Sequence, residues 1–433
     1  MNDTIFAEAT APGRAGVSII RLSGPDAWAG AEALAGTLPE PRKTGLRNLV
    51  DSNGNILDQA VAVCFEKGHS FTGERSVELH VHGSRAVVAA VLSALSQVAG
   101  LRPAKAGEFT RRALENGNLD LTQVEGLADL IAAETESQRV QAVNVMQGAL
   151  STLCANWRRD LTRSAALLEV TMDFADEEVP TDVTDSVLAL LDRIGGDLAQ
   201  EVAGADISER IRDGFEVAII GRPNVGKSTL LNCLAGREAA ITSDVAGTTR
   251  DVIEVHMNLG GLPVTLLDTA GLRASDDAIE AMGVSLAVKR ASNADLRLFL
   301  IDDGDQPADL NVAMIDDDIV VTTKADVKES NNEFAVSGRT GQGVDALTAA
   351  IAKVLQGRAA KAGSATRQRH VVAMRAAIGA LDSARLQLQA SIDSTELAAE
   401  EIRSAIRHLD ELIGRVGVEN ILDVVFMDFC IGK

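Results

Sequence analysis

The sequence is poor in cysteine and has no long apolar run. Its four cysteines, Cys64, Cys154, Cys233 and Cys430, are scattered without disulfide-like or metal-like spacing, which favours a reducing compartment. No stretch approaches the roughly 18 uninterrupted apolar residues of a transmembrane helix. Residues 1–4 carry neither the basic nor the apolar part of a secretory signal. We therefore expect a cytoplasmic protein without a membrane partner.

Positive charge is also scarce. The chain has 41 Lys and Arg against 62 Asp and Glu, which gives a formal net charge of −21. Residues 1–118 are balanced, with twelve of each kind, so the excess acid lies in the rest of the chain. A protein that holds nucleic acid on its own broad surface would normally be basic there. Any contact with RNA must therefore use a local basic patch or a second protein.

The 433 residues exceed the size of one core, and the sequence pattern changes along the chain. Residues 1–118 alternate short β-branched runs with a helical stretch, which predicts an α+β domain. Residues 119–213 carry apolar side chains every three or four positions, as long amphipathic helices do. Residues 214–358 alternate strands and helices, and residues 359–433 return to the helical period. The simplest arrangement is an all-α domain interrupted by an inserted α/β domain.

A phosphate-binding loop opens the α/β segment. Gly221 to Thr229 match G-x-x-x-x-G-K-[ST], follow the strand-like run Phe215 to Ile220 and precede a helical run. Backbone N–H groups of such a loop wrap the phosphates, and the helix N-terminus adds a favourable dipole. We expect Lys227 to reach the β- and γ-phosphates and Ser228 to place its hydroxyl on Mg²⁺.

Two metal- and phosphate-sensing elements follow in the order that a GTPase needs. Gly247 to Asp251 can supply a second hydroxyl to Mg²⁺, which we assign to Thr249. The apolar run Val264 to Leu267 then ends in Asp268-Thr269-Ala270-Gly271. An acidic residue at a strand end can hold Mg²⁺ through water, and the Gly271 amide can sense the γ-phosphate.

The base-recognition element is Thr322 to Asp326, after the strand-like run Ile319 to Val321. Asp326 can accept both the N1–H and the exocyclic amine of guanine, a pair that adenine does not offer. Ser337-Gly338-Arg339 lie downstream, where a loop would back the base. Most such domains have Asn where Thr323 stands, so we expect guanine specificity through Asp326 with somewhat weaker affinity. Four elements in order predict a GTPase.

The group that activates water is not evident from these motifs. Leu272 occupies the place where Ras-like switches carry a water-positioning Gln. Either hydrolysis is nearly absent, or another group orients the water. Asp276, Asp277 and Glu280 are candidates, and the alternative is that they form a solvated switch loop. The positive charge that stabilises the transition state could come from an ion in place of an arginine.

Beyond these motifs, the chain closely resembles the MnmE (or TrmE) family of tRNA modification GTPases over essentially its full length. The resemblance includes the placement of the G domain between two helical halves. It rests further on five sequence runs: Ala11 to Val17, Phe71 to Glu74, Gly107 to Ala113, Leu119 to Leu121, and Cys430 to Lys433.

The resemblance implies a multidomain α/β protein and a function. It implies an N-terminal tetrahydrofolate-binding and dimerisation domain (1–118), a helical domain (119–213 and 359–433) and an inserted Ras-like P-loop G domain with a doubly wound sheet (214–358). The implied activity is K⁺-stimulated, Mg²⁺-dependent GTP hydrolysis by a homodimer. With a flavoprotein, MnmG (GidA), it would form a heterotetramer that adds a carboxymethylaminomethyl-type group to C5 of the tRNA wobble uridine, using a tetrahydrofolate one-carbon unit. The alternative is a GTP-dependent switch in ribosome assembly, although no basic RNA-binding module is visible.

The resemblance also implies roles for residues of the G domain. Asn224 matches a K⁺ ligand, and the backbone oxygens of Ser243, Val245 and Thr248 match the others. Glu280 matches the carboxylate that orients the water, with Lys227 as the second catalytic residue. The expected nucleotide-binding set is Asn224, Val225, Gly226, Lys227, Ser228, Thr229, Ser243, Asp244, Val245, Ala246, Gly247, Thr248, Thr249, Asp268, Thr269, Ala270, Gly271, Thr323, Lys324, Asp326, Ser337, Gly338 and Arg339.

For the folate site, the resemblance implies Arg21, Glu78 and Lys433. A fourth position, usually Lys, is Asn118 here, which removes one cation near the ligand. Cys430 matches a thiol near the modification site, while its apolar neighbours are equally typical of an inert buried cysteine. His80 and His82 lie two residues apart without a third ligand, so we expect them to be structural.

Overall fold

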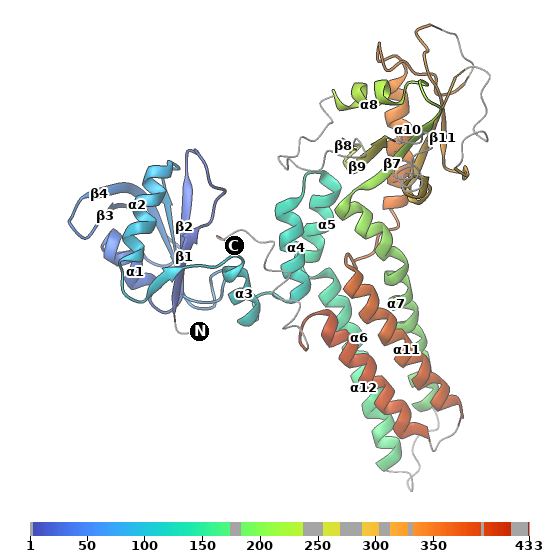
Figure 1. Ribbon diagram of the computed structural model, residues 1–433. Coiled ribbons are helices and arrows are strands. Elements are labelled where there is room, and N and C mark those ends of the chain that lie inside the picture. The colour runs from blue at the N-terminus through green and yellow to red at the C-terminus, as the bar shows by residue number, and fades with distance from the viewer. Residues whose placement is uncertain are drawn as a thin grey trace, which may run out of the picture. The chain divides into compact units, whose positions relative to one another are not determined.

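The computed structural model describes residues 3–173, 183–236, 254–268, 288–302, 312–327, 332–390, 394–416 and 432. The chain forms two compact units. Figure 1 shows the chain coloured by residue number from blue at the N-terminus to red at the C-terminus. The first unit comprises Met1–Ala128 with Leu409–Lys433, and the second comprises Asp129–His408. No helix among the described residues is long and apolar enough to cross a membrane.

The first unit is built on a six-stranded sheet in the order β3-β4-β5-β2-β1-β6. Its pairs are antiparallel except β1 with β6, which is parallel. Helices α1 and α2 bury their apolar residues with those of the sheet in one core, which confirms the predicted α+β class. The elements are β1 (Thr4–Glu8), β2 (Ser18–Ser23), α1 (Ala27–Ala35), β3 (Thr44–Val50), β4 (Ile56–Phe65), β5 (Ser76–Val81), α2 (Arg85–Ser96), β6 (Leu101–Pro103) and α3 (Glu108–Glu115).

Long helices follow, as the apolar period predicts. In α7, Val187, Leu191, Ile194 and Leu198 recur every three or four residues and are buried, and this helix packs on α5, α6 and α11. This part of the chain is therefore helical on both sides of the second sheet, and its first and last helices, α4 and α12, extend into the first unit. The helices are α4 (Leu121–Ala132), α5 (Glu136–Met146), α6 (Ala149–Asp173), α7 (Val183–Asp213), α11 (Gln368–Ala390) and α12 (Thr395–Leu412).

The second unit also contains a five-stranded sheet in the order β11-β10-β7-β9-β8. All pairs are parallel except β8 with β9. Helices α8 and α10 share a core with one face, while Ala291 and Ala294 pack on Ala218, Ile220 and Phe299 at the other. The sheet is thus covered on both faces, as expected for a doubly wound fold. Its elements are β7 (Phe215–Gly221), α8 (Lys227–Ala235), β8 (Glu254–Leu259), β9 (Leu262–Asp268), β10 (Leu296–Ile301), β11 (Ile319–Thr322) and α10 (Val344–Ala359).

Candidate functional site

The phosphate-binding loop joins the end of β7 to the start of α8. Gly226 caps α8 with φ +112°, and Asn224 has φ +63°, so both residues adopt the left-handed region. A side chain at Gly221 would lie 2.7 Å from the Leu300 carbonyl oxygen, which explains the glycine there. Lys227 is 8% exposed, and its Nζ donates to the carbonyl oxygens of Gly221 (2.8 Å) and Arg222 (3.1 Å). The loop therefore holds an ammonium group where phosphate oxygens would compete for its protons.

Ser228 and Asp268 meet at the mouth of this loop. The Ser228 hydroxyl donates to Asp268 Oδ2 at 3.0 Å, although the two residues are 40 positions apart. Asp268 is 4% exposed, and its Oδ1 has no hydrogen-bond partner among the described residues. A buried carboxylate oxygen without a partner is costly unless a ligand or ordered water satisfies it. Hydroxyl and carboxylate oxygens are the ligands that Mg²⁺ prefers, so this pair fits the predicted metal.

Thr323 connects the base-recognition loop to the phosphate-binding loop. Its side chain is buried, and its hydroxyl donates to the Val225 carbonyl oxygen at 2.7 Å, across 98 residues. The Ile301 carbonyl oxygen lies 3.4 Å away. This hydroxyl is therefore used to fix the two loops together, a role that the sequence pattern did not reveal.

Asp326 lies beside the Ser337–Arg339 loop. A hydrogen bond from Ser337 holds the pKa of the exposed Asp326 carboxyl below its usual range, and the charge of Arg339 acts in the same direction. A side chain at Gly338 would lie 2.8 Å from both the Leu230 amide nitrogen and the Thr229 carbonyl carbon. The loop thus packs on the first turn of α8, which brings base-recognition and phosphate-binding residues together.

Replacing Thr323 with valine should weaken GDP and GTP binding by about 5- to 150-fold. Valine keeps the shape but leaves the buried Val225 carbonyl without its donor, and such a loss costs roughly 1–3 kcal/mol. Isothermal titration against both nucleotides measures the change. Thr348→Val is the matched control, because that hydroxyl donates within its own helix to Asp345. Equal affinities in Thr323→Val and the unmodified chain would show that the tie has no part in binding.

Several predicted residues lie outside the described residues, and their roles remain predictions. This group includes all the predicted metal- and nucleotide-binding residues between α8 and β8 and those that directly follow Asp268. It also includes the three candidate carboxylates for orienting the water and the two predicted C-terminal residues. They are Ser243, Asp244, Val245, Ala246, Gly247, Thr248, Thr249, Thr269, Ala270, Gly271, Asp276, Asp277, Glu280, Cys430 and Lys433.

In the first unit, Arg21 and Glu78 face each other across β2 and β5. Arg21 Nη2 lies 2.9 Å from Glu78 Oε1, and Arg21 Nε donates to the same oxygen at 3.0 Å. The guanidinium carbon lies 5.4 Å from the centre of the Phe71 ring and 5.8 Å from that of Phe109, within cation–π range. The two rings were not predicted as site residues, although both belong to the runs that carry the family resemblance.

Asn118 lies next to the same aromatic residue. Its Nδ2 donates to the carbonyl oxygens of Ser70 (3.0 Å) and Phe71 (3.2 Å). At the other end of the chain, a side chain at Gly432 would overlap the Glu8 carbonyl oxygen and lie 2.5 Å from Ala9 Cα. Arg21 therefore contacts both Glu78 and the Phe71 ring, Asn118 bonds to the Phe71 backbone, and residue 432 packs against the end of β1.

His80 of β5 and His82, which directly follows the strand, each face a carboxylate. His80 Nε2 lies 3.5 Å from Glu78 Oε2, and His82 Nδ1 lies 2.8 Å from Asp58 Oδ1. Over the part of the chain that the structure describes, no group of three or more His, Cys, Asp or Glu side chains could hold a metal ion. The observed pairing is compatible with a structural role.

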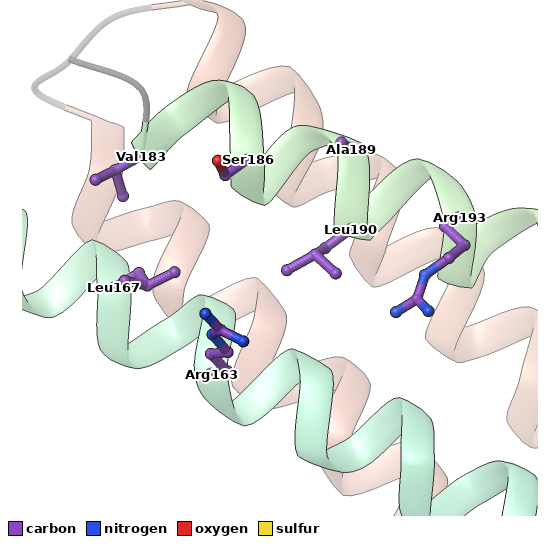
Figure 2. Close-up of a pocket in the computed structure, with 7 residues that line it drawn as sticks. All are labelled: Arg163, Leu167, Val183, Ser186, Ala189, Leu190 and Arg193. Carbon is purple, nitrogen blue, oxygen red and sulfur yellow. The ribbon is translucent and has the colours of Figure 1, made fainter. Parts of the chain in front are cut away.

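In the second unit, a cavity of about 660 Å³ lies between α6 and α7. Figure 2 shows Leu167 and Leu190 pointing into it from opposite helices, with Arg163 and Arg193 beside them. Arg193 pairs with Asp160 at 2.5 Å. None of the predicted site residues lines this cavity.

Two family models match the chain. The model described as MnmE helical domain matches residues 121–430, and the model described as GTP-binding protein TrmE N-terminus matches residues 4–118.

Curated relatives match along the whole chain. A protein of Cereibacter sphaeroides named tRNA modification GTPase MnmE is 57% identical over 431 residues, covering 100% of both chains. Proteins of the same name from Dinoroseobacter shibae (55% identical over 431 residues) and Paracoccus denitrificans (48% over 434 residues) also cover 100% of both chains.

Proposed function

Because the chain belongs to the MnmE family, we propose that it is a Mg²⁺-dependent GTP hydrolase that acts in tRNA modification. The observation that carries this proposal is the meeting of three sequence-distant elements at one edge of the five-stranded sheet. Lys227 lies at the end of the phosphate-binding loop, and Asp268 accepts a hydrogen bond from Ser228. The Thr323 hydroxyl connects the base-recognition loop to the phosphate-binding loop through the Val225 carbonyl oxygen. A nucleotide needs all three at once.

Each element has a defined task in binding and hydrolysis. The backbone of residues 224–229 and the Lys227 ammonium bind the phosphates, and Asp326 binds the guanine edge while the Ser337–Arg339 loop backs it. Ser228 and Asp268, with Thr249 outside the described residues, would hold Mg²⁺. A bound Mg²⁺ neutralises charge that develops between the β- and γ-phosphates.

Potassium is the proposed source of the remaining positive charge. Asn224 is exposed at the tip of the phosphate-binding loop in the left-handed conformation, where its side-chain oxygen can face an ion beside the phosphates. The backbone oxygens of Ser243, Val245 and Thr248 would complete the site. Glu280 would orient the attacking water, because Leu272 offers no polar group for that purpose.

GTP turnover should be faster in KCl than in NaCl by on the order of 100-fold, the lower end of the contribution of one preorganised electrostatic contact to a transition state. Asn224→Ala should remove most of this difference while GDP binding persists. Phosphate release at equal ionic strength measures both. Equal turnover with Na⁺ as the only monovalent cation would contradict the potassium assignment and leave guanine nucleotide binding intact.

The first unit is the proposed folate site. Arg21 contacts Glu78 and the Phe71 ring, and Asn118 bonds to the Phe71 backbone. Lys433, which lies outside the described residues, is the fourth proposed residue of the site. A tetrahydrofolate derivative carries amino, amide and carboxylate groups that suit a carboxylate, an amide and cations. We place the N-terminal domain at 1–118, the helical domain at 119–213 and 359–433, and the G domain at 214–358.

Arg21→Met should weaken binding of 5-formyl-tetrahydrofolate to the full-length chain by about tenfold or more, because a hydrogen bond to a charged group contributes about 1.5–3 kcal/mol. Fluorescence or calorimetric titration gives the affinity. Arg75→Met is the matched control: Arg75 also lies over an aromatic ring, Trp28, at 5.2 Å, but belongs to no predicted site. Equal losses in both variants would argue against the folate assignment.

The proposed reaction is addition of a carboxymethylaminomethyl-type group at C5 of the tRNA wobble uridine. We propose that a homodimer acts in the cytoplasm with the flavoprotein MnmG (GidA) as a heterotetramer, and that GTP hydrolysis drives domain rearrangement. The net charge of −21 favours a partner that supplies much of the tRNA-binding surface. Mass spectrometry of tRNA from a deletion strain tests this function. An unchanged wobble uridine there would favour the ribosome-assembly alternative.

A further inference from the structure

The β8–β9 hairpin ends on the helical part of the second unit. Its two-residue tip is Gly260-Gly261, with φ +59° and +87°, between the paired residues Leu259 and Leu262. The Gly261 carbonyl oxygen accepts from the Ser137 amide in the first turn of α5, at 3.0 Å. The Gly260 carbonyl oxygen accepts from Gln356 Nε2 of α10, at 2.9 Å. Figure 1 shows α5 beside the β8–β9 pair.

The opposite end of the same hairpin carries Asp268, the acidic residue of the nucleotide site. All seven residues of β9 are buried, and the strand is paired with β7 on one side and β8 on the other. A strand of this length spans roughly 20 Å. Because it is hydrogen-bonded on both edges, a displacement of Asp268 passes to the tip more readily than it is absorbed within the strand.

The contact at the tip is one of several separate hydrogen bonds that hold this region together. Gln138 Nε2 of α5 donates to the Arg212 carbonyl oxygen at 2.8 Å, which ties α5 to the last turn of α7. The segment between α10 and α11 is also bonded to α7, because the Ser208 hydroxyl donates to the Gly363 carbonyl oxygen at 2.8 Å. Among the described residues, the hairpin and α5 share one backbone hydrogen bond, from the Ser137 amide to the Gly261 carbonyl oxygen. Its loss would leave the α5–α7 and Ser208–Gly363 hydrogen bonds in place.

Space for movement lies beside the tip. A cavity of about 610 Å³ is lined by residues of α5, α7 and α10 together with Gly260 and Gly261. The rim includes Glu136 and Gln141 of α5 and Gln356 of α10. A tip that leaves Ser137 can therefore shift without displacing packed core side chains.

We propose that the β8–β9 hairpin regulates the helical domain according to the nucleotide at the GTP site. In the observed state Ser228 bonds to Asp268 and the tip bonds to α5. With Mg²⁺ and GTP bound, Ser228 and Asp268 would both turn to hold the metal, so their mutual hydrogen bond would be lost, and β9 would pass this change to the Gly261–Ser137 contact. This inference rests on the proposed GTP site and names the element that transmits its state.

The test is a disulfide across the contact. A Cβ built on Gly261 lies 3.7 Å from Glu136 Cβ, close to the mean of about 3.8 Å in disulfides. The full chain carries Glu136→Cys and Gly261→Cys, with Cys233→Ser and Cys430→Ser to remove background thiols; Cys64 and Cys154 are buried. The rate of disulfide formation under a mild oxidant is measured with GDP and with Mg²⁺ plus a non-hydrolysable GTP analogue.

We expect cross-linking to be about tenfold slower with the GTP analogue than with GDP. The reference pair is Gly73→Cys with Asn116→Cys in the first unit, where the built Cβ lies 3.2 Å from Asn116 Cβ at another positive-φ glycine; its rate should not respond to nucleotide. Equal rates at 136 and 261 in both states overturn the proposal, as does a variant that binds GDP normally but never cross-links. The readout needs no tRNA, so failure here leaves the modification function standing. Failure of the GTP site itself is recognised separately, as absence of GTP binding by the unmodified chain.

Discussion

Asp326→Asn should change the base preference of this protein from guanine to xanthine nucleotides. The carboxylate accepts from N1–H and from the exocyclic amine of guanine, and hydrogen bonds to a charged group contribute about 1.5–3 kcal/mol each. Asparagine offers one acceptor and one donor, and its donor suits the carbonyl that xanthine carries in place of the amine. GTP affinity should therefore fall by at least about 100-fold, while the affinity for xanthosine triphosphate rises.

The position of Asp326 makes the Asp326→Asn substitution a direct test of base recognition. Asp326 is exposed, and the hydrogen bond from Ser337 lowers the pKa of its carboxyl, so at neutral pH the ionised carboxylate accepts hydrogen bonds from the nucleobase. Asp316→Asn is the matched control, because Asp316 is an exposed residue of the same unit outside every predicted site. Competition binding with both nucleotides gives the result. A variant that keeps full GTP affinity and gains nothing for xanthine would remove Asp326 from base recognition.

Asp268→Asn should reduce Mg²⁺-dependent GTP hydrolysis by on the order of 100-fold, comparable with removal of one transition-state contact. Asparagine has nearly the same shape and can still bond to Ser228, so GDP binding should change much less. What is lost is the negative charge at a buried oxygen that has no hydrogen-bond partner among the described residues. The Mg²⁺ concentration for half-maximal turnover should rise as well.

A Mg²⁺ titration of single-turnover hydrolysis measures both effects. Thermal unfolding without nucleotide shows whether the variant is folded, and Asp316→Asn again serves as the reference. Wild-type turnover at low Mg²⁺ in Asp268→Asn would contradict the metal role of the Ser228–Asp268 pair.

Within the nucleotide site, the sequence predicted the elements whose structure depends on residues that are close together along the chain. The phosphate-binding loop is a continuous run whose glycines permit left-handed φ, and its flanking strand and helix follow from apolar periodicity. The strand ending at Asp268 and the strand before Asp326 were likewise predictable, and the structure confirms all of these elements.

Three contacts depended on the tertiary structure because they join residues far apart in the chain. The Thr323 hydroxyl meets Val225 across 98 positions, so its role could not be derived from the motif in which it lies. Arg21 and Glu78 meet through the register of β2 with β5, which the sequence suggested only through family resemblance.

The hairpin contact is the clearest case. Gly261 and Ser137 belong to a sheet and a helix that show no shared pattern in the sequence, and they meet because α5 and the β8–β9 pair pack on the same end of α7. Local geometry is encoded in residues that are neighbours along the chain, so the sequence by itself determined the GTP-binding motifs and the class of each domain. Register and packing arise from the summed burial of many side chains, so only the folded chain decided which of these residues touch.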